Sequence, residues 1–326
     1  MKIIVTGGAG FLGSHLCDKL IERSDEVICV DNLITGSEKN IAHLKNNSNF
    51  TFINQDVTEI NSEILRSAQD DQLVGQIYHL ASPASPNKNN PKSYISLPFE
   101  TMHVNTNGTW KLCEAAVRLG AKFLFASTSE VYGNPLEHPQ KEEYRGNVST
   151  TGPRAVYDES KRFGETITSA FVRSKGLDGV IVRIFNTYGP RMADDGRVVI
   201  EFVKAALSNE QAPSFGSKPF PVFGDGKQTR SFCYVSDMVG GIIAAMEKGE
   251  KGEVYNLGNP QEFSILELAQ KVKELTGSTS DVEHKPLPAD DPKQRCPDIT
   301  KAKSELGWEP KVNFEDGLKK LIESLK

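Results

Sequence analysis

The sequence lacks long apolar runs, paired cysteines and an excess of positive charge. No apolar stretch approaches the roughly 18 residues that a transmembrane helix needs, so we expect no membrane span. Lys and Arg number 38 against 43 Asp and Glu, which gives a net charge of -5, and no basic block interrupts the chain. We therefore expect neither nucleic acid nor a membrane surface as partner, whereas local arginines can still hold a small anionic ligand.

The cysteines and the chain length set further limits. The 5 cysteines form no Cys-x-x-Cys pair and show no metal-ligand spacing with the 6 histidines, so we predict reduced thiols, no bound metal and a cytoplasmic location. Met1 runs directly into the first predicted strand, so we expect no signal peptide. A chain of 326 residues exceeds one typical domain, so we expect a main domain and a smaller one.

A buried strand followed by a glycine-rich turn opens the chain. Residues 2–6 are predicted to form the strand, and Gly7, Gly10 and Gly13 follow at the G-x-x-G-x-x-G spacing that joins a strand to a helix. Gly7 permits a tight reversal, Gly10 lets the backbone approach phosphates, and Gly13 lets the helix lie against its strand. Because the helix N-terminus offers free N–H groups and partial positive charge, the turn predicts a pyrophosphate site.

The next strand specifies the dinucleotide. A predicted helix over 11–21 leads to a strand over 26–30, which ends at Asp31. A carboxylate at this position accepts hydrogen bonds from the ribose hydroxyls and repels a 2′-phosphate, which predicts NAD and not NADP. The alternative is a glycine-rich turn with no ligand, and the full order of strand, turn, helix, strand and acid argues against it. Asp56, after a third predicted strand, is either an adenine contact or a helix N-cap.

Predicted strands and helices alternate as far as about residue 186, which is typical of a Rossmann-type α/β fold with a doubly wound parallel sheet. Beyond it the rhythm breaks, which predicts a smaller C-terminal substrate lobe. We expect an NAD-binding domain over 1–186 with a returning segment at about 228–250, and a nucleotide-sugar lobe formed by 187–227 and 251–326. The polar segment 87–98 is predicted to be a surface loop, and long helices are predicted over 99–119 and 154–174.

Tyr157 and Lys161 form a candidate catalytic pair. They are four residues apart on a predicted helix, so their side chains share one face. A lysine charge beside a phenol favours the phenolate and lowers its pKa, which allows the tyrosine to act as a general base. A Tyr-x-x-x-Lys spacing also occurs as a plain surface pair. Here it follows a dinucleotide turn and the Ser127-Thr128 strand end in the order that catalysis requires.

These motifs together resemble the extended short-chain dehydrogenase/reductase family. The shared stretches are Thr6–Gly13, Ser127–Thr128, Tyr157 with Lys161, and Arg183–Pro190. Within the family the chain is most similar to the UDP-glucuronate decarboxylases, through Val30–Gly36, His79–Pro86, Ala126–Gly133, Gly152–Lys161, Asp195–Val199 and Asp290–Asp298. The resemblance spans nearly the whole chain.

The resemblance implies NAD-dependent conversion of UDP-glucuronate to UDP-xylose. Tyr157 would take the proton of the sugar 4-hydroxyl while hydride passes to NAD, and Thr128 would hydrogen-bond the same oxygen. The resulting 4-ketone makes the sugar acid a β-keto acid, which loses carbon dioxide through an enolate. Protonation at the 5-position and return of the hydride then give the pentose and recycle NAD.

Glu130 and its neighbour separate the reactions of this family. The 4,6-dehydratases carry an Asp-Glu pair at this strand end, and Ser129 stands here where their acid would be. The Ser129-Glu130 pair matches the decarboxylases, in which the glutamate assists carboxylate loss or reprotonation; the alternative for Glu130 is a capping or solvated carboxylate. A 4-epimerase, a 4,6-dehydratase and a non-catalytic NAD sensor remain as alternative functions.

The resemblance also implies a set of binding residues and an assembly. Arg230 would reach the sugar and diphosphate as part of the catalytic site, and Arg154 or Arg230 would meet the sugar carboxylate. The long predicted helices resemble those that form a four-helix dimer interface, so we expect a homodimer. The predicted substrate contacts are Ser82, Asn186, Arg197, Arg230, Asp291 and Arg295; the predicted cofactor contacts are Gly7, Gly10, Phe11, Leu12, Gly13, Asp31, Asn32, Thr35, Gly36, Asp56, Val57, Leu80, Ser82, Tyr157, Lys161 and Thr187.

Overall fold

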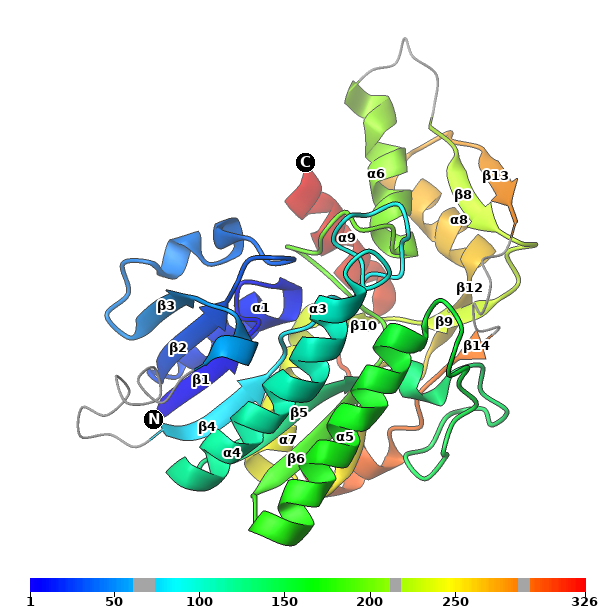
Figure 1. Cartoon of the computed structure of the whole chain (residues 1–326). Coiled ribbons are helices and arrows are strands. Elements are labelled where there is room, and N and C mark those ends of the chain that lie inside the picture. The colour runs from blue at the N-terminus through cyan, green and yellow to red at the C-terminus, as the bar shows by residue number, and fades with distance from the viewer. Residues whose placement is uncertain (61–73, 212–217, 287–293) are drawn as a thin grey trace.

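A seven-stranded parallel sheet forms the centre of the protein (Figure 1). The computed structural model describes residues 1–60, 74–211, 218–286 and 294–326. The strand order is β11-β6-β5-β4-β1-β2-β3. The chain adds strands first on one side of β1 and then on the other, and this reversal of strand order confirms the Rossmann-type fold. The strands are β1 (Lys2–Thr6), β2 (Glu26–Asp31), β3 (Phe50–Asn54), β4 (Val74–His79), β5 (Lys122–Thr128), β6 (Gly179–Ile184) and β11 (Val254–Leu257).

Helices cover both faces of this sheet. On the face turned toward the viewer in Figure 1 lie α4 (Thr109–Leu119) and α5 (Ala155–Lys175), and on the other lie α1 (Phe11–Glu22) and α7 (Val235–Lys248). Phe123 and Phe125 of β5 belong to one apolar core, whereas Leu124 between them belongs to the other. Successive side chains of a strand point to opposite faces of the sheet, and helices bury both faces. A central strand therefore has a continuous run of apolar residues. None of the described helices is long and apolar enough to cross a bilayer.

The predicted long helix over 99–119 is present but interrupted. It comprises α3 (Pro98–His103), a π-helical turn η4 (Val104–Gly108) and α4. Asn105 of this turn is buried and donates a hydrogen bond to Ser160 Oγ of α5 at 3.0 Å. Such π turns often lie at functional sites, and this one faces the helix that carries Tyr157.

A smaller group of elements lies above the carboxyl end of the sheet (Figure 1). Pairing is parallel between β8 (Phe220–Phe223) and β13 (Val282–Lys285), and between β7 (Thr187–Tyr188) and β10 (Cys233–Tyr234); β9 (Thr229–Ser231) lies between β12 (Glu262–Ser264) and β14 (Gln294–Arg295). The helices are α6 (Val198–Gln211), α8 (Ile265–Thr276) and α9 (Phe314–Leu325).

Strand β11 belongs to the central sheet and not to the smaller lobe in which the predicted domain boundaries place it. The sequence places the segment from residue 251 onward in the smaller lobe, yet β11 pairs with β6 as an edge of the central sheet. The preceding α7 packs on the sheet and returns the chain to that edge, where Tyr255 and Leu257 are fully buried. The division into an NAD-binding domain and a sugar-nucleotide lobe stays a prediction.

Candidate active site

A single cavity of about 1210 Å³ brings the predicted residues together. It opens at the carboxyl ends of β1, β2, β4, β5 and β6, where ligands bind in open α/β sheets, and the smaller lobe closes it from above. Each predicted site residue among those described lines this cavity. Asp291 lies outside the described residues.

The glycine turn fits a dinucleotide pyrophosphate. Gly7 adopts φ 74°, and a Cβ on Gly13 would lie 2.1 Å from Gly7 O, so the turn admits no larger residue there. Gly10 precedes α1 without a side chain to cap it, and the first turn carries no acidic residue. The N–H groups of Phe11 and Leu12 thus begin a helix whose positive end faces the cavity, which is a suitable anion site.

Two carboxylates lie in the adenosine half of the cavity. Asp31 accepts hydrogen bonds from Ala9 N at 3.0 Å and Leu33 N at 2.8 Å, and burial raises its pKa although these bonds oppose the shift. Asp56 accepts from Thr58 N at 2.7 Å and caps η3 (Val57–Glu59), so the N-cap interpretation of this residue is confirmed. Asp56 also lines the cavity, and its contact with adenine stays a prediction.

The candidate base Tyr157 is buried between the cofactor and sugar halves. Burial raises its pKa, and hydrogen bonding with Thr128 opposes the shift. The phenol pKa is thus raised and not lowered as the Tyr-x-x-x-Lys spacing predicted, because the sequence does not reveal how completely the tyrosine is buried. Lys161 Nζ donates to Ala126 O at 2.8 Å, and burial lowers the pKa of its ammonium to about 7.

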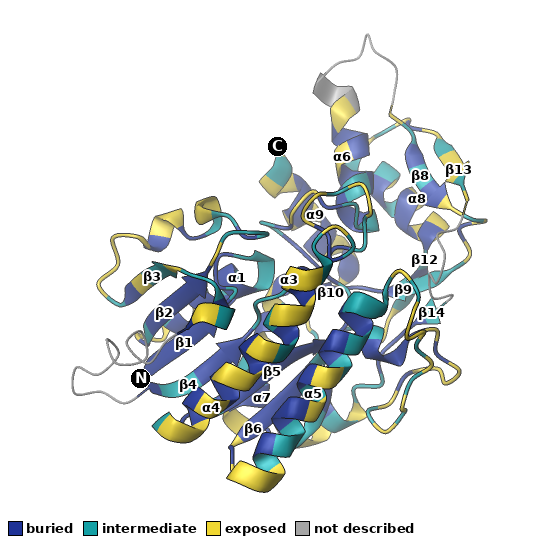
Figure 2. Cartoon of the chain, viewed as in Figure 1, coloured by how far each residue is buried: buried dark blue, intermediate teal, exposed yellow. Residues whose placement is uncertain are grey.

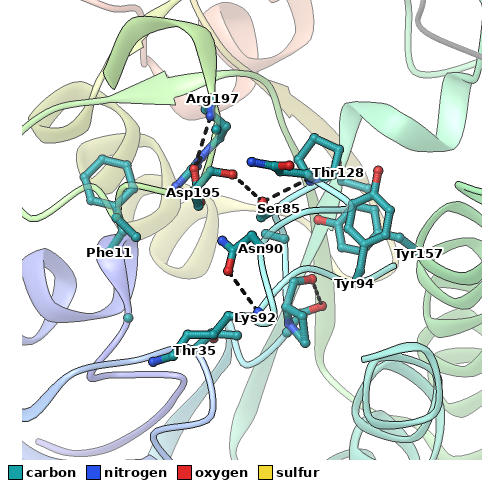
Figure 3. A pocket seen from close by; sticks show the side chains of 18 of the residues that line it. Phe11, Thr35, Ser85, Asn90, Lys92, Tyr94, Thr128, Tyr157, Asp195 and Arg197 are labelled. Atoms are coloured by element: carbon teal, nitrogen blue, oxygen red, sulfur yellow. Dashed lines mark hydrogen bonds and ion pairs between the residues drawn. The ribbon is translucent and has the colours of Figure 1, made fainter. Parts of the chain in front are cut away.

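The segment predicted as a surface loop crosses the cavity instead. Tyr94 is 1% exposed and stacks on Tyr157, with ring centroids 4.7 Å apart and planes 8° apart (Figure 3). Just before this segment, Ser85 Oγ donates to Asp195 O at 2.7 Å, which ties the start of the segment to the smaller lobe. The polar composition of the segment hid this role, because Tyr94 meets a partner 63 positions away in the sequence.

Glu130 lies between two arginines at the end of β5. Its carboxylate oxygens pair with Arg154 Nη2 and Arg295 Nη1, each at 2.5 Å. Burial alone would raise the pKa of Glu130, but the charges of Arg154 and Arg295 outweigh burial and bring the pKa to about 2. Glu130 is therefore an ionised, fixed carboxylate, and not the solvated residue of the alternative interpretation.

The remaining predicted residues have these contacts. Arg295 is 2% exposed and donates to Ser129 Oγ at 3.2 Å and Gly133 O at 2.9 Å. Arg197 pairs with Asp195 at 2.9 Å and lies 5.8 Å from the Phe11 ring centre, on the side of the cavity away from Tyr157 (Figure 3). The roles assigned to Arg197, Arg230, Arg295, Asn186 and Ser82 toward the sugar nucleotide stay predictions.

All five cysteines are buried and free of disulfide bonds, as expected. The fold does bring Cys296 within 4.8 Å of possible metal ligands on His138 and Glu262, a proximity that the sequence spacing did not indicate. These groups already have protein partners. His138 Nε2 and Glu262 Oε2 are 2.8 Å apart, and the Cys296 thiol donates to Pro260 O at 3.3 Å.

Comparison with known proteins agrees with this geometry. Residues 3–258 match the model of the NAD dependent epimerase/dehydratase family. The chain belongs to this family. Over its full length, this epimerase/dehydratase family member is 50% identical to UDP-glucuronic acid decarboxylase 1 of Arabidopsis thaliana, of which it covers 70%.

Two solved structures of the family share the fold. The UDP-glucose 4-epimerase of Thermotoga maritima, solved with UDP-glucose, matches with a TM-score of 0.87 and 33% identity over 100% of this chain and 98% of its own. The UDP-glucuronic acid 4-epimerase of Bacillus cereus, solved with UDP-glucuronic acid and NAD, matches with a TM-score of 0.86 and 31% identity over 100% and 99%. NAD is accordingly the cofactor of this family member, and the glycine turn and Asp31 are suited to hold it.

Sequence reasoning missed two residues of this region. Tyr94 gave no signal beyond being an aromatic residue in a polar segment. Asp158 follows Tyr157 directly, and its carboxyl is buried next to the Glu130–Arg154 pair. The available signal was an acidic residue next to the candidate base Tyr157. Neighbours on a helix point in directions about 100° apart, so the carboxyl group can lie close to the site without sharing the face of Tyr157.

Proposed function

We propose that the protein converts UDP-glucuronate to UDP-xylose and carbon dioxide, with NAD recycled in each turnover. The observation that carries the proposal is full-length similarity, at 47–50% identity, to decarboxylases of this substrate. The Ser129-Glu130 pair at the end of β5 supports it, because Ser129 cannot act as the acid that elimination at the 6-position needs.

The first half-reaction oxidises the sugar at its 4-position. NAD, when bound, supplies the hydride acceptor and a positive nicotinamide ring that favours a nearby phenolate. Tyr157 takes the 4-hydroxyl proton, Thr128 orients the same oxygen, and Tyr94 fixes the tyrosine ring by stacking. Lys161, held by Ala126 O, completes the polar wall around the base.

The second half-reaction breaks the bond between C5 and the carboxylate. The 4-ketone accepts the electron pair of this bond and becomes an enolate. Because carbon dioxide leaves from the carboxylate, the chain must bind the substrate acid without protonating it. Ionised Glu130 repels a carboxylate, while Arg154, Arg230 and Arg295 supply positive charge in the same region. We infer that the arginines bind anionic groups of the sugar nucleotide and that Glu130 disfavours retention of the sugar acid.

The alternative with support is 4-epimerisation of the same substrate, since solved 4-epimerases share the fold. Incubation with UDP-glucuronate and catalytic NAD, followed by NMR of the sugar and measurement of carbon dioxide, separates the two. UDP-xylose and carbon dioxide without net reduced cofactor are expected. UDP-galacturonate without carbon dioxide would replace the proposal by an epimerase, and unchanged UDP-glucuronate would overturn both. The Tyr157→Phe variant is the control for chemistry by this site.

We further propose a homodimer formed through α3, α4 and α5. Exposed residues follow the outer faces of these helices (Figure 2), and three of the exposed side chains are large and apolar: Phe99 is 69% exposed, Phe163 54% and Trp110 49%. Exposed aromatic residues on neighbouring helices support a symmetric four-helix contact with a second copy. Sedimentation is expected to give a dimer, and Trp110→Glu to give monomers; a monomeric natural chain would contradict the proposal. The five free thiols support a reducing, cytoplasmic location, which cell fractionation tests.

A further inference from the structure

The proposed decarboxylation consumes one proton per turnover at C5, and a role for any donor of this proton rests on that function. The bond from C5 to the carboxylate breaks, carbon dioxide leaves, and the electron pair enters the ketone as an enolate. A proton must then form the new C5–H bond, which restores the 4-ketone. The proton taken by Tyr157 returns to the 4-oxygen when hydride returns to C4. The C5 proton therefore needs a separate source.

Glu130 lies close to the sugar half of the cavity but does not store a proton. Both of its oxygens are paired with arginine, and it stays ionised at neutral pH. A carboxylate of this kind passes a proton on only when a neighbouring group supplies one. The wall behind Glu130 contains such a group.

Asp158 lies behind this wall in a second cavity of about 320 Å³. Glu130 and Arg154 line both cavities, whereas Asp158 lines the second. Asp158 is 6% exposed, and its Oδ1 has no hydrogen-bond partner among the residues that the structure describes. A buried carboxyl oxygen without a donor favours the protonated form, because a carboxylate there would lack compensation.

The charges around Asp158 agree with this geometry. Burial and the charges of Glu130 and Glu159 raise the pKa of Asp158, the charges of Arg154 and Arg295 oppose them, and the resulting pKa is about 7. Tyr94 and Tyr157 face the same region. Arg154 and Arg295 pair with Glu130 and keep its carboxylate ionised. Of the two neighbouring carboxyl groups, Asp158 is therefore the one that holds a proton.

We propose that Asp158 is a positioning residue that holds a proton behind Glu130 and supplies it, through Glu130, to C5 of the decarboxylated sugar. Asp158 becomes a carboxylate as the C5–H bond forms, and it regains a proton from water in the second cavity. Asn134, Asn147 and Ser149 line that cavity, which is polar and large enough for water.

Single-turnover mixing of the NAD-loaded enzyme with UDP-glucuronate tests the proposal with Asp158→Asn. Asparagine keeps the size of the side chain and removes the exchangeable carboxyl proton. The near-ultraviolet absorbance of reduced nicotinamide should rise at the natural rate, since oxidation at C4 precedes the affected step. Its decay should slow at least tenfold, because hydride returns only after C5 is protonated. Glu315→Gln, a charge change at an exposed position of α9, should leave both phases unchanged.

The pH dependence gives a second readout that a structural role would not move. In the natural enzyme the decay phase should slow as pH rises through about 7, as Asp158 loses its proton. In Asp158→Asn this dependence should disappear, and Asp158→Glu should restore it in part. Decay at the natural rate in Asp158→Asn, or equal slowing of both phases, would overturn the proposal. A natural decay phase independent of pH would do the same even if the asparagine variant did not fold. Absence of carbon dioxide from the natural enzyme would instead refute the proposed function and this inference with it.

Discussion

Replacing Glu130 by glutamine removes a negative charge that pairs with both Arg154 and Arg295. The side chains of Arg295 and Arg154 are 2% and 14% exposed, so water compensates them poorly. Removing one partner of a buried ion pair costs about 3–5 kcal/mol. Glutamine retains one acceptor oxygen, so we expect the lower end, about 3 kcal/mol. At about 2 °C per kcal/mol for a chain of this size, the melting temperature should fall by about 6 °C.

Thermal unfolding at pH 7.5 and fixed NAD concentration measures this effect. The matched control is Glu22→Gln, because Lys19 and Glu22 pair at the same 2.5 Å but their side chains are 51% and 60% exposed. An exposed pair contributes at most about 1 kcal/mol, so the control should melt within about 2 °C of the natural protein. Asp158 can partly replace the lost charge, because removal of Glu130 lowers its pKa. The double variant Glu130→Gln with Asp158→Asn should therefore be less stable than the single one. The reasoning would be refuted if the single and the double variant both melted at the temperature of the natural protein.

Three further predictions concern the cofactor half of the site. Tyr157→Phe should lower turnover by at least about 10²-fold, while NAD binding measured by calorimetry persists. Tyr94→Phe keeps the ring stack and should lower turnover far less. Equal losses of turnover in the two variants would contradict the assignment of Tyr157 as the base. Gly13→Ala should abolish NAD binding because its Cβ would meet Gly7 O at 2.1 Å, whereas Gly240→Ala, with open space to 3.8 Å, should bind normally; NAD binding to both would refute the cradle. Burial lowers the pKa of Lys161 to about 7 from 10.5, so the unfolded state binds more protons between these values and stability should rise with pH there. Melting of the cofactor-free protein at pH 7 and 9 checks this, and Lys161→Met should remove that part of the slope.

The sequence predicted those parts of the molecule that rest on local signals. The glycine turn, the acid at the end of β2 and the alternation of strands and helices are short-range patterns, and they placed every described site residue in one cavity. The edge strand β11 escaped because four residues carry little pattern of their own. Tyr94 escaped because its stacking partner is far away in the sequence, and polar neighbours suggested a surface loop.

Electrostatic states were harder to predict, because they depend on burial more than on the identity of neighbours. The spacing of Tyr157 and Lys161 correctly placed both on one helix, yet it gave the wrong direction for the phenol pKa. Glu130 posed the reverse problem. Its arginine partners come from the start of α5 and from β14, and only the folded chain brings their charges together.

Helix α5 carries two proton-holding groups that must act separately. Tyr157 and Lys161 line the large cavity, whereas Asp158, one residue along the helix, lines the small one. The rotation of the helix is fixed by its close seat on β5, where a Cβ on Gly164 would lie 2.4 Å from Phe125 Cζ. If α5 were rotated about its axis, Tyr157 and Asp158 would exchange cavities or would both be buried in the protein. A fixed helix instead keeps the proton for the 4-oxygen on one side of Glu130 and the proton for C5 on the other, which allows one active site to perform both transfers in order.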